Sequence, residues 1–173
     1  MKGFNKILVK YLPIIALGIT ILCLALLFIP QSFLEFKVQW HYSGFEALFF
    51  FSWGNDYLRN NAGSTGGVIV IGIIAMILMV LSAPLYALSK KSSAAMLLGS
   101  ILTVIGAVIF LTMELWIKSI YKGNGSAYFM TYIIGVFLLV TGGLGIYASI
   151  VRLLEEKNAP VKSSTKSYSY LKK

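Results

Sequence analysis

Few side chains in this sequence have the types and spacing that support chemistry. Cys23 is the single cysteine and His41 the single histidine among 173 residues. A thiol oxidoreductase needs a cysteine pair, and a transition-metal site needs several His or Cys ligands close together. The patterns G-x-S-x-G, HExxH, GxGxxG and the P-loop do not occur. We therefore expect a protein that is not an enzyme, that holds no metal or cofactor, and in which His41 is solvated.

Glu114 is the one carboxylate within a hydrophobic run, and such groups commonly mark an ion pathway or a binding partner. Lys118 follows four residues later, so on a helix the two side chains share a face in the favourable order for an ion pair. We expect a membrane-embedded ion pair near the outer end of its helix. The alternative is a role for Glu114 at the mouth of an outward-facing cleft.

The one long segment that is too polar for lipid spans residues 31–67. From Leu34 to Tyr42 it alternates apolar and polar side chains, which predicts a strand with one wet face. The stretch Phe45–Trp53 is expected to return as a second strand after a turn at Ser43-Gly44. The alternative is a short surface helix with Phe45, Phe49 and Trp53 on one stripe. In either form the segment is too short to build its own core, so it must rest on membrane helices.

This outer segment is also unusually rich in aromatic residues. Exposed apolar patches mark binding sites or membrane contact, and large aromatic side chains dominate interaction hot spots. The candidate partner-binding residues are Trp40, Phe45, Phe49, Phe50, Phe51 and Trp53.

The composition is that of a membrane protein, with 58% hydrophobic and only 12% charged residues. Four apolar runs are each long enough to cross about 30 Å of hydrocarbon. They cover about 11–29, 68–89, 94–117 and 127–151. The predicted fold class is an all-α integral membrane protein, a four-transmembrane-helix antiparallel bundle with a small β-hairpin-like extracellular segment between helices 1 and 2.

The ends of the chain complete this layout. The first run follows three lysines, as in a signal peptide, but no small-x-small cleavage site follows it, so we expect a retained helix. The membrane domain is predicted to cover 1–151. Residues 152–157 are expected to extend the last helix, and the remainder of the basic, Ser-rich tail 152–173 to be disordered and cytoplasmic.

The net charge of +9 is distributed unevenly. Eleven Lys and Arg residues fall on the side that holds both termini and Lys90-Lys91, and four fall on the other side. This bias predicts cytoplasmic termini in the plasma membrane. Because the basic residues flank apolar runs and no nucleic-acid motif occurs, we expect the lipid bilayer, and not nucleic acid, to be their partner.

Small residues recur every four positions in the last two runs, which lets helices approach closely. We expect these two helices to pack on each other, with association between copies as the alternative. The small residues are Ala95, Gly99, Thr103 and Ala107 in the third run and Thr141, Gly145 and Ser149 in the fourth.

Four spans, both ends inside, a long aromatic first outer loop and a short second one resemble the layout of claudin-type tetraspan membrane proteins. Trp40 stands where that family has a loop Trp. Where the family has Gly-Leu-Trp this sequence has Ser52-Trp53-Gly54, and the family's two loop cysteines have no counterpart. The resemblance implies a β-bearing outer loop that contacts other proteins, and no site residue is carried over from it. An unrelated small bacterial four-helix membrane protein is the alternative.

These observations favour a non-enzymatic accessory or interaction subunit. It would bind a membrane-protein partner, or a second copy of itself, through the aromatic outer loop and the small-residue helix faces. The alternative is a small transporter or channel component. Transport needs polar or ionisable side chains that converge near the midplane, and the expected spans hold few of them.

Overall fold

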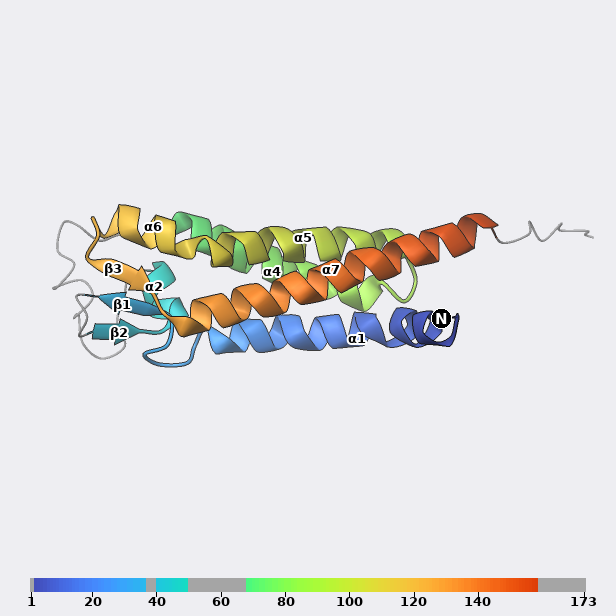
Figure 1. Ribbon diagram of the computed structural model, residues 1–173, viewed down its shortest axis with the longest axis horizontal. Helices are drawn as coiled ribbons and strands as arrows, with labels where there is room; N and C mark the ends of the chain where they lie inside the picture. The colour runs from blue at the N-terminus through green and yellow to red at the C-terminus, as the bar shows by residue number, and fades with distance from the viewer. Residues whose placement is uncertain (1, 37–39, 50–67, 159–173) are drawn as a thin grey trace, which may run out of the picture.

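The computed structural model describes residues 2–36, 40–49 and 68–158. Its long axis is formed by four helices that run side by side (Figure 1), α1 (Lys2–Leu26), α4 (Val70–Leu88), α5 (Ser93–Leu111) and α7 (Phe129–Asn158). Helix α5 packs on α4 and α7, and α1 packs on the same two helices. The structure is therefore mostly helical, as predicted.

All the remaining elements gather at one end of these helices (Figure 1). They are the short helices α2 (Gly44–Phe49) and α6 (Met113–Ile120) and the strands β1 (Leu34–Phe36), β2 (Trp40–Tyr42) and β3 (Gly125–Ala127). We call this the sheet end. The opposite end, where residues 89–92 join α4 to α5, is called the link end.

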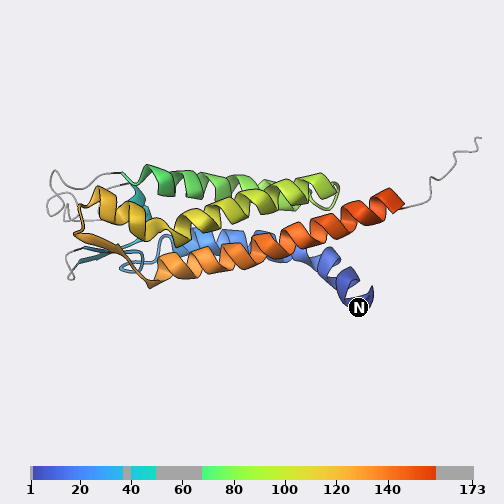
Figure 2. The ribbon, with the colours of Figure 1, turned by 45° about the horizontal axis from the view of Figure 1, so that its top comes forward.

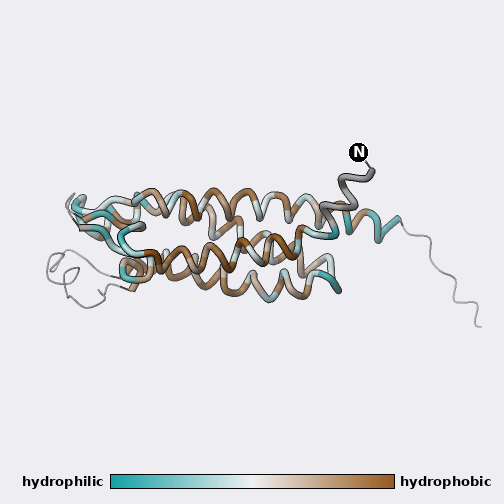
Figure 3. Tube along the Cα trace, turned by 90° about the horizontal axis from the view of Figure 1, so that it is seen from below, coloured by the Kyte–Doolittle hydropathy of each residue, from teal (hydrophilic) through white to brown (hydrophobic). Residues whose placement is uncertain are grey.

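Helices α4, α5 and α7 are long and apolar enough to cross a membrane, whereas the apolar part of α1, Lys10–Leu26, is shorter. Figure 3 shows hydrophobic residues along the long helices and hydrophilic ones toward the two ends. Many large apolar side chains on these helices are exposed, among them Ile77, Val108 and Val140. Apolar surface of this extent is typical of contact with lipid, so the three helices indicate a membrane location.

Helix α1 is longer at its start than the expected run 11–29, since it begins at Lys2 and ends at Leu26. Pro13 therefore lies inside the helix and not in its first turn. Proline has no N–H to donate to the preceding turn and is a common cause of helix bending. Figure 2 shows α1 bent toward its N-terminal end, away from the other long helices.

The helix expected over 94–117 is divided in the structure. Helix α5 ends at Leu111, and α6 begins at Met113. Between them the Thr112 hydroxyl donates to the Val108 carbonyl at 2.9 Å. A threonine that bonds back onto the preceding turn often bends a helix. The break directs α6 across the sheet end, and it places Glu114 beyond the last residue of α5.

The predicted small antiparallel sheet is present, with the strand order β2-β1-β3. Residues 34–42 do not form one strand, because Leu34 pairs with Tyr42 and Phe36 with Trp40. Residues 37–39 lie outside the described part of the chain. Directly paired residues share a face, and here the partners are all even-numbered or all odd-numbered. The alternation is therefore the same for one straight strand and for two that fold back on each other.

Strand β3 was not predicted and pairs with the free edge of β1, Leu34 opposite Ala127 and Phe36 opposite Gly125. From the sequence, only a short loop was expected between the third and fourth spans. Lys122 and Gly123 both have positive φ, 49° and 81°, and turn the chain before the strand. Pairing with β3 gives hydrogen-bond partners to backbone N–H and C=O groups of β1 that would otherwise have none in the sheet.

The prediction of a return strand over Phe45–Trp53 is wrong for residues 45–49, the part of this stretch that the structure describes. Residues Gly44–Phe49 form helix α2 instead, which is the alternative considered above. Its first turn is closed by a reciprocal pair. Glu46 Oε2 accepts from the Ser43 N–H at 2.9 Å, and the Glu46 N–H donates to Ser43 Oγ at 3.3 Å. This is a capping box, which stabilises a helix start and not a strand.

Phe33 joins the sheet end to the long helices. Its N–H donates to the Tyr42 carbonyl at 2.9 Å, and its carbonyl accepts from the Tyr128 N–H at 2.8 Å and from the Thr131 hydroxyl at 2.9 Å. Its ring is fully buried and meets the edge of Phe110 on α5, with centroids 6.1 Å apart. Residues from β2, α5 and the first turn of α7 thus meet at one side chain and its backbone.

Helices α5 and α7 approach closely at the predicted small residues. A Cβ added to Gly142 would lie 3.0 Å from the Ser100 carbonyl oxygen and 3.1 Å from the Val104 nitrogen. These are backbone atoms, which cannot rotate away. At the next residue, Gly143, an added Cβ would meet nothing within 4 Å. The two glycines have the same helix propensity and differ in their surroundings.

We predict that Gly142→Ala destabilises the protein relative to Gly143→Ala. Both changes remove the same helix-propensity penalty of about 1 kcal/mol, so the difference reports packing alone. Overpacking of this kind costs about 1–3 kcal/mol, and the unfolding temperature of Gly142→Ala in detergent should fall by several degrees below that of Gly143→Ala. Circular dichroism at 222 nm measures both. Equal unfolding temperatures would contradict the packing of α5 on α7.

Candidate functional site

Three phenylalanine rings form a stack at the sheet end. Phe45 and Phe49, one turn apart on α2, have ring centroids 4.7 Å apart. Phe45 also stacks on Phe28, just beyond the end of α1, at 4.8 Å and an interplanar angle of 23°. Phe28 is 55% exposed, and Phe45 and Phe49 are half-buried. We call these three rings the aromatic stack.

The opposite side of α2 fixes the stack in place. Ala47 and Leu48 are fully buried in the core. The Leu48 carbonyl accepts from the Ile69 N–H at 3.1 Å, and the Phe45 N–H donates to the Leu27 carbonyl at 2.9 Å. The capping box holds the first turn of the helix. A half-exposed aromatic surface is therefore held on a backbone that has little freedom to move.

The other predicted partner-binding residues are only partly described. Trp40 forms β2 opposite Phe36, and its side chain is outside what the structure describes. Phe50, Phe51 and Trp53 also lie outside the described residues. The structure therefore brings Phe45 and Phe49 together and adds Phe28, which the sequence analysis did not select. Its position at the end of the expected run 11–29, next to the outer segment, was the available signal.

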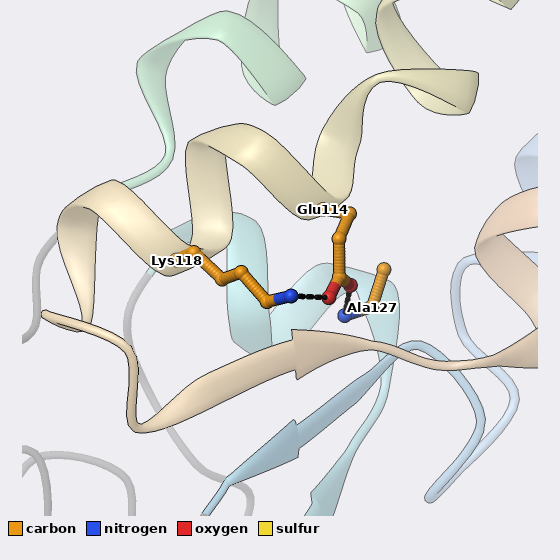
Figure 4. Close-up of polar contacts among 3 residues, drawn as sticks. All are labelled: Glu114, Lys118 and Ala127. Atoms are coloured by element: carbon orange, nitrogen blue, oxygen red, sulfur yellow. Dashed lines mark hydrogen bonds and ion pairs between the residues drawn. The ribbon is translucent and has the colours of Figure 1, made fainter.

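Glu114 links α6 to the sheet (Figure 4). Its Oε1 lies 2.7 Å from Lys118 Nζ, and its Oε2 accepts from the Ala127 N–H of β3 at 2.5 Å. The Glu114 side chain is 25% exposed and that of Lys118 is 56% exposed. The carboxylate thus bonds within α6 and across to β3.

The surroundings of Glu114 lower its pKa. Burial by itself raises that pKa, but the hydrogen bonds from Lys118 and from the Ala127 N–H, together with the positive charge of Lys118, outweigh it. The carboxylate is therefore held in its ionised form. This arrangement suits a structural clasp between α6 and β3.

Buried hydroxyl groups in the long helices mostly bond to their own helix. In the part of the chain that the structure describes, no Asp, Glu, Lys, Arg or His side chain is buried. The Tyr86 hydroxyl and Thr103 Oγ1 lie 2.9 Å apart and join α4 to α5. Buried hydroxyls that donate to a carbonyl of their own helix include those of Thr20, Ser82, Ser100, Thr103 and Ser149.

The link end is held by two side chains from the extension of α7 beyond residue 151. The Arg152 guanidinium donates to the Ser89 carbonyl at the end of α4, at 2.8 Å. Glu156 accepts a hydrogen bond from the Ser93 hydroxyl in the first turn of α5. Each charge suits the helix end that it contacts, positive at a C-terminus and negative at an N-terminus. Neither contact was predicted from the sequence.

His41 does not face open water as expected. Its ring lies 4.9 Å from that of Tyr128, and its Nδ1 atom is buried with no hydrogen-bond partner among the described residues. Tyr128 follows β3, so strand pairing brings the two rings together. Because β3 was not predicted from the sequence, the contact between His41 and Tyr128 could not be predicted either.

The described residues contain no group of three His, Cys, Asp or Glu side chains placed to hold a metal ion. Comparisons of the chain with protein-family models, curated proteins and solved structures gave no match. The resemblance to claudin-type tetraspan proteins therefore stays a prediction. Function has to be argued from the geometry of this chain.

We predict that Glu114→Gln destabilises the protein at neutral pH and not in acid. Because the folded-state pKa lies below the ordinary value of 4.5, the ionised carboxylate stabilises the fold above pH 4.5. That contribution is lost as the pH falls through the folded-state pKa. At pH 7 the unfolding temperature of the variant should be lower by roughly 1–4 °C, and the gap to the unmodified chain should close in acid.

The matched control is Glu155→Gln, an exposed glutamate on the extension of α7. It should leave the unfolding temperature unchanged at both pH values. A gap between Glu114→Gln and the unmodified chain that is the same at pH 7 and pH 3 would contradict the role of the charge.

Proposed function

We propose that this chain is a multi-pass membrane protein with four spans that acts as a non-enzymatic accessory or interaction subunit. Helix α1 supplies the fourth span. Its apolar part, Lys10–Leu26, measures about 25 Å at 1.5 Å per residue, which is at the lower end of the length that crosses the hydrocarbon. It packs along α4 and α7 while Ile14, Ile21 and Leu22 remain exposed, as do the outward residues of the other three helices. The four helices would form an antiparallel bundle.

The proposed orientation puts the link end in the cytoplasm and the sheet end outside the plasma membrane. Lys90 and Lys91 are exposed at the link end, and Lys10 lies near the start of α1. The eleven-to-four division of Lys and Arg supports this orientation.

The observation that carries the proposed function is the aromatic stack on a fixed α2. Rigid aromatic side chains provide contact area without the entropy cost of ordering a flexible loop. Phe28 follows α1 directly, which puts the stack near the membrane border. A second membrane protein reaches that level, so the proposed partner is a membrane protein that covers Phe28, Phe45 and Phe49.

Transport has less support from the same geometry. Most buried hydroxyls of the long helices bond to their own helix or to one another, and among the described residues of these helices Thr141 Oγ1 is the buried hydroxyl without a hydrogen-bond partner. Glu114 is bonded to Lys118 and to the Ala127 N–H beyond the end of α5. A solute pathway needs polar groups that are free to coordinate a solute near the midplane.

The orientation predicts which cysteines an impermeant thiol reagent can reach in intact cells. In a Cys23→Ala background, Asn124→Cys at the exposed turn of the sheet end should react. Ser92→Cys at the exposed link end should react only after the membrane is permeabilised. Both positions are solvent-exposed in the structure, so the membrane is the difference between them. Labelling of Ser92→Cys in intact cells would overturn the orientation.

The aromatic stack predicts which substitutions release a partner. In Phe45→Ala/Phe49→Ala, proteins that co-purify with the unmodified chain from native membranes should be depleted about tenfold or more, since hot-spot truncations cost 2 kcal/mol or more. Quantitative mass spectrometry of the eluates measures the depletion.

The control is Phe137→Ala, an exposed phenylalanine about a third of the way along α7. It should keep the same partners, and all variants should unfold cooperatively in detergent. If the double variant keeps its partners while Glu114→Gln abolishes a solute flux, the transporter alternative should replace this proposal.

A further inference from the structure

A groove lies between α1 and α4 toward the link end, with a volume of about 310 Å³. One wall is formed by residues of α1 and the other by the end of α4. Its lining consists of Pro13, Ile14, Leu17, Tyr86, Ala87 and Lys90. Lys90 is the charged residue in this lining. It lies at the end of the groove that is beyond the last turn of α4.

The two walls follow from helix geometry. Pro13 and Leu17 are one turn apart on α1 and so lie on one face. Tyr86 and Ala87 lie in the last turn of α4, and Lys90 follows in the turn after it. Ala87 is small and leaves room between the walls. Toward its N-terminal end α1 bends away from the other long helices (Figure 2).

Positive charge is concentrated at the mouth of the groove. Lys10 precedes Ile14 by one turn of α1 and is exposed. Among the described residues no carboxylate pairs with Lys90. The nearby guanidinium of Arg152 already bonds to the Ser89 carbonyl, and Glu156 is bonded to Ser93. The ammonium of Lys90 therefore remains available to an anion at the level where lipid head groups lie.

We propose that this groove binds one anionic phospholipid, with its phosphate against Lys90 and an acyl chain along Ile14, Leu17 and Ala87. An apolar groove that ends in a lysine at the membrane border has the two chemical features of such a lipid in the right order. Basic pockets between membrane helices on the cytoplasmic side are suited to anionic head groups. This inference rests on the proposed membrane placement of α1, and it does not depend on the aromatic stack or its partner.

The test is native mass spectrometry of the full chain in detergent with added phosphatidylglycerol or phosphatidylcholine carrying identical dioleoyl chains. The unmodified chain should retain one phosphatidylglycerol in preference to phosphatidylcholine. Lys90→Gln should lower that preference about fivefold, which corresponds to one lysine near a lipid phosphate. Lys91→Gln, the adjacent lysine outside the groove, should change it less than about twofold.

A second pair of variants tests the groove itself. Ala87→Trp should fill the groove and remove the retained lipid of either kind. Leu88→Trp, at the adjacent exposed residue of α4, should leave lipid retention unchanged. Equal losses in Lys90→Gln and Lys91→Gln would show diffuse attraction, and lipid retained by Ala87→Trp would place it elsewhere. Either result, or equal retention of the two lipids by the unmodified chain, overturns the proposal.

Both pairs of variants test lipid binding separately from the proposed function. Lipid retention is measured on the purified chain, where no partner protein is present. Failure of the partner experiment therefore leaves the lipid result unaffected, and the reverse also holds.

Discussion

The sheet end of this protein depends on Phe33. A segment of this length cannot form a core of its own, and its backbone polar groups need partners at the border of an apolar environment. Phe33 meets both requirements, because its backbone bonds to Tyr42, Tyr128 and the Thr131 hydroxyl while its ring is buried against Phe110. Beside it, the Ser32 carbonyl accepts from the Met130 N–H at 3.2 Å, a first-turn donor of α7 that has no partner within that helix. Once this junction forms, β1 has a fixed position, and β2, β3 and α2 are placed from it.

The sequence predicted the four long helices, the small antiparallel sheet and the close packing of α5 on α7. Each of these features has a local pattern in the sequence. The helices show as apolar runs long enough to cross lipid, the sheet as alternating apolar and polar residues, and the helix packing as small residues every four positions. Alternation could not separate one strand over 34–42 from two paired strands, since the same residues share a face in both. Strand β3 has three residues, too few for any pattern. The contacts of Arg152 and Glu156 join residues 63 apart, which a single sequence does not reveal.

Helix α2 is different, because its signal was present in the sequence. Ser43-Gly44-Phe45-Glu46 is a capping-box pattern, and the six-residue helix begins where that pattern predicts. The aromatic content of the following residues favoured a strand, since aromatic side chains are common in strands. Here the local hydrogen bonds of the cap decided the structure. The consequence for function is direct, because one helical turn brings the rings of Phe45 and Phe49 to 4.7 Å, next to Phe28, whereas four residues along a strand span about 13 Å.

The resulting molecule has a closely packed interior with specialised surfaces at its two ends. The proposed function uses the aromatic stack at the sheet end, and the proposed lipid groove uses Lys90 at the link end. The most direct test of the central claim places a photoreactive phenylalanine analogue at position 49 in living cells and irradiates them. The account predicts discrete protein adducts from position 49 and none when the analogue is at position 137. Adducts with lipid alone at position 49, or the same protein adducts from both positions, would contradict it.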